Sequence, residues 1–440
     1  MKKALRFLFL LLLIFALGLG VFSCSQTETE PQKESPKGSP ELIDTDLIGD
    51  RFDLTNHVLD FIKENFYDDI DYDEADLYTA YGLVASLGKY NYINPIESFF
   101  GSSSDGKGFG LIVRNTKYNE HLIDFILEGS PFLTPSNGKQ VLRGDEIYAI
   151  DGYRLSGLDT SSYSAYLATL PSDEEVVFTM KRGEEKFDVS YTKVDFDFPY
   201  CIYINDLSGV PEKFGYICLR TFDGTQTGKV ENEFERAVRS FNEDGNEALI
   251  LDLRGNGGGS GDVLRQVASH LIGDFAANEA LVEIHYAKEN RSVSLTAVAT
   301  DEKISTPIYI LCDGQTASAS EALIGTMKAH GTLTALIGQD TVGKGVAQNG
   351  VTVNADGTIR GYITDKGLDE DGEEADIGAY IVQVIIGKYY IYDGSVEGGK
   401  YCMHGVPFVP DIEVKEEIVV TPDYSEDPYI RAAIEAHTKK

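Results

Sequence analysis

The sequence predicts a multidomain α/β chain, in which an α/β core with a mostly parallel sheet follows a small N-terminal helical domain and a β-rich domain. Its 440 residues leave room for two or three domains that each bury a core. From residue 197 onward, apolar runs of strand length alternate with helical patterns, which is typical of buried parallel strands joined by helices. Strand patterns dominate residues 101–196, and helical spacing dominates residues 46–100.

The N-terminus predicts an exported and anchored protein. Residues 1–23 have a basic start, an apolar run and Val-Phe-Ser before Cys24, which is a secretory signal pattern. A small residue directly before a cysteine resembles the lipobox of bacterial lipoproteins. This resemblance implies that Cys24 carries lipid and anchors a cell-envelope protein facing the periplasm or the exterior; a plain signal peptide is the alternative. Residues 24–45, rich in Ser, Thr, Pro, Glu and Lys, predict a flexible tether.

The composition excludes some classes of partner. A formal net charge of −33 repels phosphate backbones, which argues against nucleic acid as a ligand. The seven histidines show no paired metal-binding spacing, so no metal or other cofactor is expected. Four cysteines beyond the tether match no metal motif and are expected to be buried free thiols, with disulfides as the alternative: Cys201, Cys218, Cys312 and Cys402.

Two helices are expected in the helical domain. Apolar residues recur at intervals of three and four between Leu54 and Phe66, and again over Ala75–Leu87. These stripes are expected to form the core of that small domain.

The β-rich domain carries two distinctive segments. GFGL opens a strand after a glycine-rich stretch, and LRGDEIYAIDG runs from a strand into an Asp-Gly turn. Together they resemble a PDZ domain, although the long connection 133–140 departs from that pattern. The resemblance implies that a loop offers backbone amides to the C-terminus of a peptide, which adds a strand to the sheet edge. The loop residues are Gly108, Phe109, Gly110 and Leu111; a tight turn before a strand is the alternative reading.

In the core, residues 197–440, buried strands and helices alternate up to a β-rich stretch and a final helix at 429–437. Functional groups are expected at the carboxyl ends of the parallel strands. Two loops follow such strands: the glycine-rich loop 255–259, and the loop that contains Ser318. The expected strands are 214–220, 248–253, 307–312 and 332–337, and the expected helices are 228–242, 262–272 and 318–330.

Ser318 lies where a strand ends and a helix begins, so its side chain faces the positive end of a helix dipole. That position favours the anionic tetrahedral intermediate that forms when a hydroxyl nucleophile attacks a carbonyl group. The same stretch is also a capping-box pattern, in which a serine is normally a helix cap. The stretch alone does not separate Ser318 from Thr316 and Ser320.

Lys344 lies between glycines and close to apolar residues, where burial can favour the neutral amine that a general base requires. On a strand, Gln348 would share its face and could orient the amine by a hydrogen bond. A solvated loop lysine is the alternative. The glycine-rich loop introduced above, which follows Arg254 and ends at Gly259, is suited to donating backbone N–H groups to an oxyanion. Dinucleotide binding is a weaker fit, because Ser260 stands where a third glycine is needed.

Four motifs together resemble the S41 family of C-terminal processing peptidases, also called tail-specific proteases. LDLRGNGGG is similar to one family segment, with Gly257 in place of the usual proline, while DGQTASASEA and GKGVAQ are similar to the nucleophile and lysine segments. GVPFVPD is similar to a closing element of the family. The resemblance implies a ClpP/crotonase-like core and a serine endopeptidase acting on proteins or peptides with exposed C-termini.

The same resemblance assigns roles to single residues. Ser318 would be the nucleophile, Lys344 its base and Gln348 an assisting residue. Backbone amides of Gly258 and Ala319 would form the oxyanion hole, and the PDZ domain would capture substrate tails without any metal. A catalytically silent, peptide-binding envelope lipoprotein is the alternative function, and a structural scaffold is a third.

Overall fold

The computed structural model describes residues 58, 72–95, 106–211, 213–224, 226, 228–276, 278–354, 359–362 and 379–439. The chain divides into two compact units, Met1–Tyr67 and Asp68–Lys440, and every element below belongs to the second. Cys24 and the first expected helix, Leu54–Phe66 apart from Val58, lie outside the described residues.

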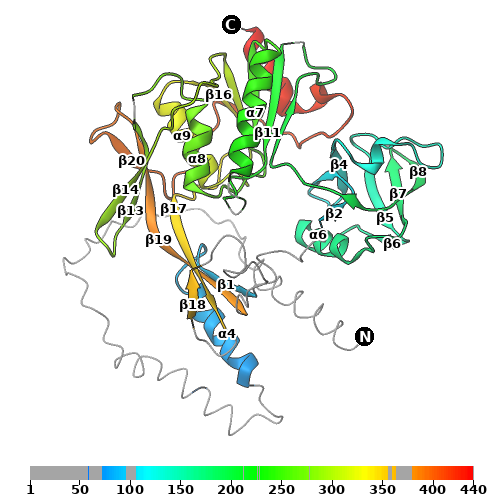
Figure 1. Cartoon of the computed structure of the whole chain (residues 1–440), viewed down its shortest axis with the longest axis horizontal. Helices are drawn as coiled ribbons and strands as arrows, with labels where there is room; N and C mark the ends of the chain where they lie inside the picture. The colour runs from blue at the N-terminus through cyan, green and yellow to red at the C-terminus, as the bar shows by residue number, and fades with distance from the viewer. Residues whose placement is uncertain are drawn as a thin grey trace. The chain divides into compact units, whose positions relative to one another are not determined.

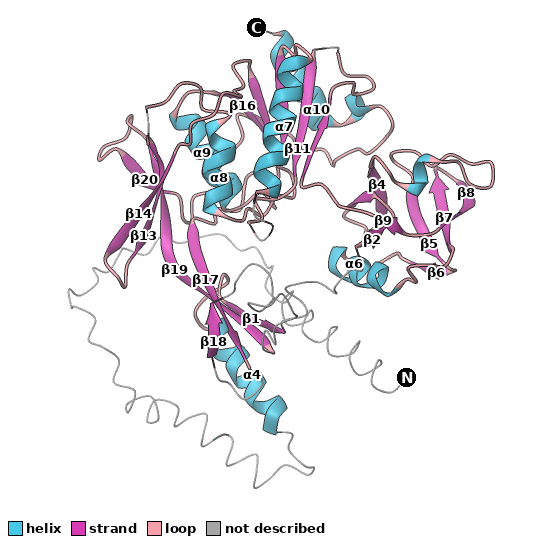
Figure 2. Ribbon diagram, in the orientation of Figure 1, coloured by secondary structure: helices cyan, strands magenta, loops and turns pink. Residues whose placement is uncertain are grey.

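A six-stranded sheet forms the centre of the α/β core (Figures 1 and 2). Its strands pair in parallel except for the first two, which are antiparallel. Near-continuous apolar sequence explains the burial of the inner strands, because both faces of the sheet are covered. In order across the sheet the strands are β10 (Cys201–Ile204), β11 (Phe214–Leu219), β12 (Ala248–Asp252), β15 (Ile308–Cys312), β16 (Leu333–Gly338) and β21 (Ile412–Glu413).

Alternate side chains of β12 enter two different cores. Leu249 and Leu251 pack with three helices on one face, α7 (Lys229–Glu243), α8 (Gly261–Ser269) and α9 (Ala319–Ala329). Ile250 packs on the other face with α10 (Pro428–Thr438). The pleat of the strand thus gives the core three layers.

A second sheet is entirely antiparallel. The strand pairing brings β1 from residues before the β-rich domain onto β19 of the core, where the sequence predicted only helices; the helix α4 (Tyr72–Ala85) precedes it. In order the main strands are β14 (Arg291–Thr296), β13 (Ala280–Tyr286), β19 (Tyr380–Tyr392), β17 (Val346–Val353) and β18 (Ile359–Tyr362), with β1 (Tyr92–Pro95) and β20 (Lys400–Cys402) also on β19.

The β-rich domain has its own sheet and its own core. Phe109, Phe132 and Phe178 meet edge to face inside it, at centroid distances of 4.9–6.3 Å. The strand β3 lies at one end of the sheet, so one of its edges has no strand partner within the described part of the chain. The strands in order are β3 (Leu111–Asn115), β4 (His121–Ile126), β5 (Glu146–Ile150), β7 (Val176–Arg182) and β8 (Glu185–Tyr191), with β6 (Tyr153–Arg154) on β5; β2 (Lys107–Gly108) pairs with β9 (Val194–Asp195), and α6 (Thr160–Thr169) is the one longer helix described here.

A buried ionic cluster supports the carboxyl end of β12. The guanidinium of Arg254 donates to Asp252 at 2.6 Å and to Asp427 at 2.8 Å, and all three side chains are at most 1% exposed. Burial alone raises the pKa of Asp252, but Arg254 and Arg114 outweigh it and lower that pKa to about 2. Asp427 also caps α10, since its other oxygen accepts from the amide of Tyr429.

The four cysteines of the described part are free, and three of them are buried. None of its helices combines the length and the apolar character that a membrane span requires.

Candidate active site

Ser318 occupies the N-cap position of α9, directly after the loop that follows β15. Its backbone is at φ 57° and ψ −115°, a conformation that is strained for a residue with a side chain. The side chain makes no capping hydrogen bond and is 7% exposed. The expected capping box with Glu321 is present, and the Ser318 hydroxyl donates no hydrogen bond to a described residue.

The structure also separates Ser318 from the two neighbouring hydroxyl groups. Thr316 Oγ1 donates to the carbonyl of Leu253, and Ser320 Oγ donates to the carbonyl of Asn256, both at 3.0 Å. These two hydroxyls are fully buried and hold the loops together. Ser318 is thus the hydroxyl of this stretch that remains available to react.

The carboxylate of Glu321 joins the serine segment to the lysine segment. Oε2 accepts from the backbone amides of Ser318 at 2.9 Å and Lys344 at 2.8 Å. Oε1 accepts from the amide of Gly343 at 2.6 Å and from Thr341 Oγ1 at 2.5 Å. Because Glu321 is completely buried, these four bonds replace the water that its charge would otherwise require. Sequence reasoning saw Glu321 only as the partner in a capping box.

Lys344 is half-buried, and burial lowers its pKa, while the nearby Glu321 opposes that shift. The ring of Tyr90 covers the amine, with Nζ 5.5 Å from the ring centroid. Tyr90 comes from the segment between α4 and β1, so a part of the chain far from the motifs screens the lysine. Nothing in the sequence around Tyr90 indicated this contact.

Gln348 lies on β17 but not in the simple alternation with Lys344 that the sequence suggested. The pairing of β17 with β19 shifts register between Ala347 and Gln348, and Lys344 precedes the strand. The amide nitrogen of Gln348 donates to the carbonyl of Tyr90. Gln348 and Lys344 therefore share Tyr90 as a neighbour, and a direct role of Gln348 on the amine stays a prediction.

The glycine loop approaches Ser318 closely. A Cβ added to Gly258 would lie 2.8 Å from Ser318 Cβ and 2.7 Å from the amide nitrogen of Ala319, and Gly258 has a φ of 97°. Only glycine fits such a contact with this backbone. The amide of Ala319, in the first turn of α9, donates to no oxygen among the described residues.

The amide of Gly258 is occupied in this structure. It donates to Oδ1 of Asn256 at 2.9 Å. Asn256 is completely buried, and its Nδ2 donates to the carbonyl of Leu219. The Gly258 amide can therefore donate to a substrate oxyanion only after it gives up its hydrogen bond to Asn256. Asn256 holds this loop in place through its two side-chain hydrogen bonds, which the sequence motif alone did not indicate.

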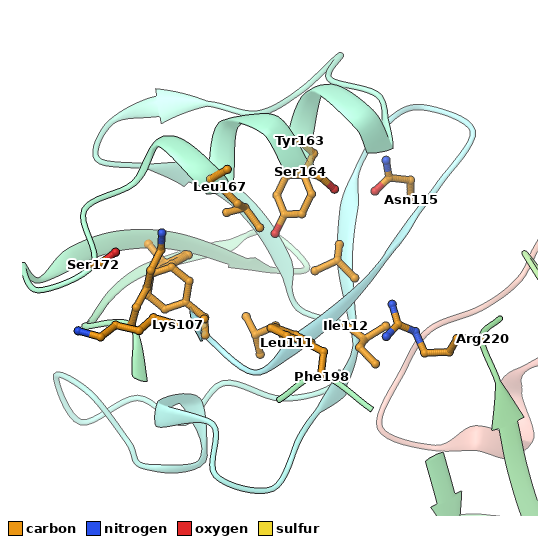
Figure 3. A pocket seen from close by; sticks show the side chains of 16 residues that line it. Lys107, Leu111, Ile112, Asn115, Tyr163, Ser164, Leu167, Ser172, Phe198 and Arg220 are labelled. Carbon is orange, nitrogen blue, oxygen red and sulfur yellow. The ribbon is translucent and has the colours of Figure 1, made fainter. Parts of the chain in front are cut away.

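A cavity of about 570 Å³ lies between β3 and α6 of the β-rich domain (Figure 3). Of the predicted peptide-binding residues, Gly108, Phe109 and Leu111 line it. Gly110 does not; it has a φ of 62°, and an added Cβ would clash with Phe196 at 2.5 Å. Gly110 thus shapes the loop, and the others form the wall of the cavity.

A hydroxyl at a helix N-terminus, a close glycine backbone and an amine whose pKa is lowered by burial are features that serine hydrolases use. The family follows from comparison: residues 213–382 match the model of peptidase family S41. The chain therefore carries a domain of peptidase family S41 over these residues.

Several known proteins are similar to this chain. It is 25% identical over 324 residues to a CtpA-like serine protease of Staphylococcus aureus (strain COL), covering 72% of this chain and 61% of the relative. It is 25% identical over 330 residues to the carboxy-terminal processing protease CtpA of Bacillus subtilis (strain 168), covering 73% and 66%. The matched region thus spans less than two thirds of either relative. A solved S41 protease from Bacteroides fragilis NCTC 9343 has the same fold, with a TM-score of 0.53, 17% identity, and coverage of 85% of this chain and 93% of that one.

Proposed function

We propose that this protein is a serine endopeptidase that cleaves proteins after recognising their C-terminal tails, with Ser318 as nucleophile and Lys344 as base. The observation that supports it most is the shared Glu321 carboxylate, which ties the backbones of both residues to one oxygen atom. Burial lowers the pKa of Lys344 and so favours the neutral amine that a base requires, and the hydroxyl of Ser318 supplies the nucleophile.

The reaction passes through an acyl-enzyme. Lys344 removes the proton of Ser318 as Oγ bonds to the scissile carbonyl carbon, and the electron pair of the C=O bond moves onto oxygen. The amide of Ala319 stabilises that oxyanion, joined by Gly258 once it leaves Asn256. Lys344 passes the proton to the leaving amine as the C–N bond breaks, and then deprotonates the water that hydrolyses the ester.

The β-rich domain acts as a PDZ domain in this proposal. A substrate tail adds a strand to the free edge of β3, and its carboxylate binds the amides of the loop from Gly108 to Leu111. A signal peptide and a lipid on Cys24 would place this activity in the cell envelope. The silent peptide-binding alternative is favoured by one observation, the occupied amide of Gly258.

A serine-directed fluorophosphonate probe separates these two functions. We expect the probe to label the full chain, with the phosphonyl adduct mapped to Ser318 by mass spectrometry and absent from Ser318→Ala. Labelling that persists in Ser318→Ala would assign the nucleophile elsewhere, and a folded wild-type protein that takes no label would support the binding-only function.

The pH dependence of cleavage tests the base. A base acts in its unprotonated form, so kcat/KM should rise as the pH increases through the pKa of Lys344. Because burial lowers this pKa, the midpoint of the rise should lie below the ordinary value of 10.5. Peptide cleavage measured from about pH 5 to about pH 10 gives the midpoint, with circular dichroism at each pH as the control for unfolding. A flat profile in this range would contradict the role of Lys344.

A further inference from the structure

The cavity between β3 and α6 has a charge opposite to that of the whole protein. The chain carries 71 acidic and 38 basic residues, yet the residues that line this cavity include three cationic side chains and no Asp or Glu. The cations are Lys107, Lys193 and Arg220. A cationic groove on an acidic protein concentrates anionic ligands at one place, while the remaining surface repels them.

The cations lie at separate places along the groove. Figure 3 shows Lys107 at one end, and Arg220 at the other, beside Ile112. Lys107 forms an ion pair with Asp173 at 2.5 Å, and Lys193 donates to the carbonyl of Leu170 at 2.8 Å. Arg220 is exposed and donates through Nη1 to the carbonyl of Pro199 at 3.1 Å, but it forms no ion pair with a described residue. The positive charge of Arg220 is therefore available to pair with an anionic group of a ligand.

A second polar group is directed into the same groove. Tyr163 of α6 is 6% exposed, and its ring stacks on His121 at a centroid distance of 4.4 Å. In Figure 3 its hydroxyl points into the cavity, and it has no hydrogen-bond partner among the described residues. This hydroxyl lines the cavity and is placed to donate a hydrogen bond to a ligand there.

The geometry of strand addition places Arg220 against a defined part of the tail. A peptide paired antiparallel to β3, with its carboxylate at the Gly108 end, runs upstream toward Asn115. Each residue advances about 3.4 Å, so the side chain beside Ile112 belongs to a residue about three to five positions from the C-terminus. The apolar side chains of Phe109, Leu167 and Phe178 line the cavity as well and suit an apolar last residue.

We propose that this groove selects C-terminal tails that carry an acidic side chain a few residues before an apolar last residue. Arg220 forms an ion pair with the acidic side chain, and Tyr163 donates a hydrogen bond to the tail. The proposal rests on the tail recognition proposed above. Arg220 belongs to the core and directly follows β11, so a residue outside the β-rich domain sets this preference.

The test uses the full chain carrying Ser318→Ala, which prevents cleavage during binding. Fluorescent decapeptides ending in an apolar residue carry Glu or Gln at the third, fourth or fifth position from the C-terminus, and Kd is measured by anisotropy. At one of these positions the Glu peptide should bind about threefold tighter than its Gln partner, as is typical of a solvent-accessible ion pair. The preference should weaken at high salt.

Substitutions assign the effect to Arg220. The preference should disappear in Arg220→Gln and persist in Arg431→Gln, a matched change at an exposed arginine of α10. Arg220→Glu should prefer Lys at the same position, which excludes loss of folding as the cause. Equal Kd values for every Glu and Gln pair, or a preference retained in Arg220→Gln, would overturn the proposal and leave tail recognition intact. If free-acid peptides bind no better than C-terminal amides, both proposals fail.

Discussion

Ser318→Ala and Lys344→Met are expected to abolish peptide cleavage while leaving the fold intact. Loss of a hydroxyl nucleophile lowers kcat by about a millionfold, and loss of a general base lowers it by about a hundred- to ten-thousandfold. Neither side chain supports the core: the Ser318 hydroxyl makes no capping hydrogen bond, and Glu321 bonds only the backbone amides of both residues. Melting temperatures should therefore stay within about 2 °C of the wild type.

A matched control separates basicity from charge at this position. Lys344→Arg keeps the positive charge and most of the length, but a guanidinium does not give up its proton in proteins. It should be as inactive as Lys344→Met. Substantial cleavage by Lys344→Arg would show that the lysine acts through its charge and that another group is the base.

Glu321→Gln is expected to reduce both activity and stability. A Gln nitrogen would face donors that now meet a carboxylate oxygen, so at least one of the amides of Ser318, Gly343 and Lys344 would lose its acceptor in a completely buried place. Each unsatisfied buried group costs about 1–3 kcal/mol, so the free energy of unfolding should fall by about 3 kcal/mol. The nucleophile and base would lose their common anchor, and kcat should fall by about a hundredfold or more.

The measurements are denaturant unfolding and steady-state cleavage of one peptide. Glu397→Gln, the same change at an exposed position, should leave both quantities unchanged. If Glu321→Gln cleaved at the wild-type rate, the carboxylate would be only a helix-capping group. A stability loss without an activity loss would have the same meaning for the mechanism.

Local patterns predicted much of the core. The apolar runs before the Arg254 loop and before Ser318 do form buried strands, β12 and β15, and the helix after Ser318 begins where the capping pattern placed it. These features depend on neighbours within a few residues, which a sequence displays directly.

Contacts between distant segments were not predictable in the same way. β1 forms because Tyr92 pairs with Gln383, and no local pattern at Tyr92 indicates a partner so far along the chain. The same distance hid the contact of Tyr90 with Lys344. The register shift before Gln348 altered a face assignment that depended on perfect alternation.

The pairing of Arg254 with Asp427 also concerns the order in which the core is completed. The two residues are 173 positions apart, whereas the other partner of Arg254, Asp252, lies two positions before it. While the chain is being synthesised, Arg254 can therefore pair with Asp252 at once, but contacts of such long separation as that with Asp427 form slowly. The buried ionic cluster at the carboxyl end of β12 is thus completed only after α10 has been made and has packed on the sheet.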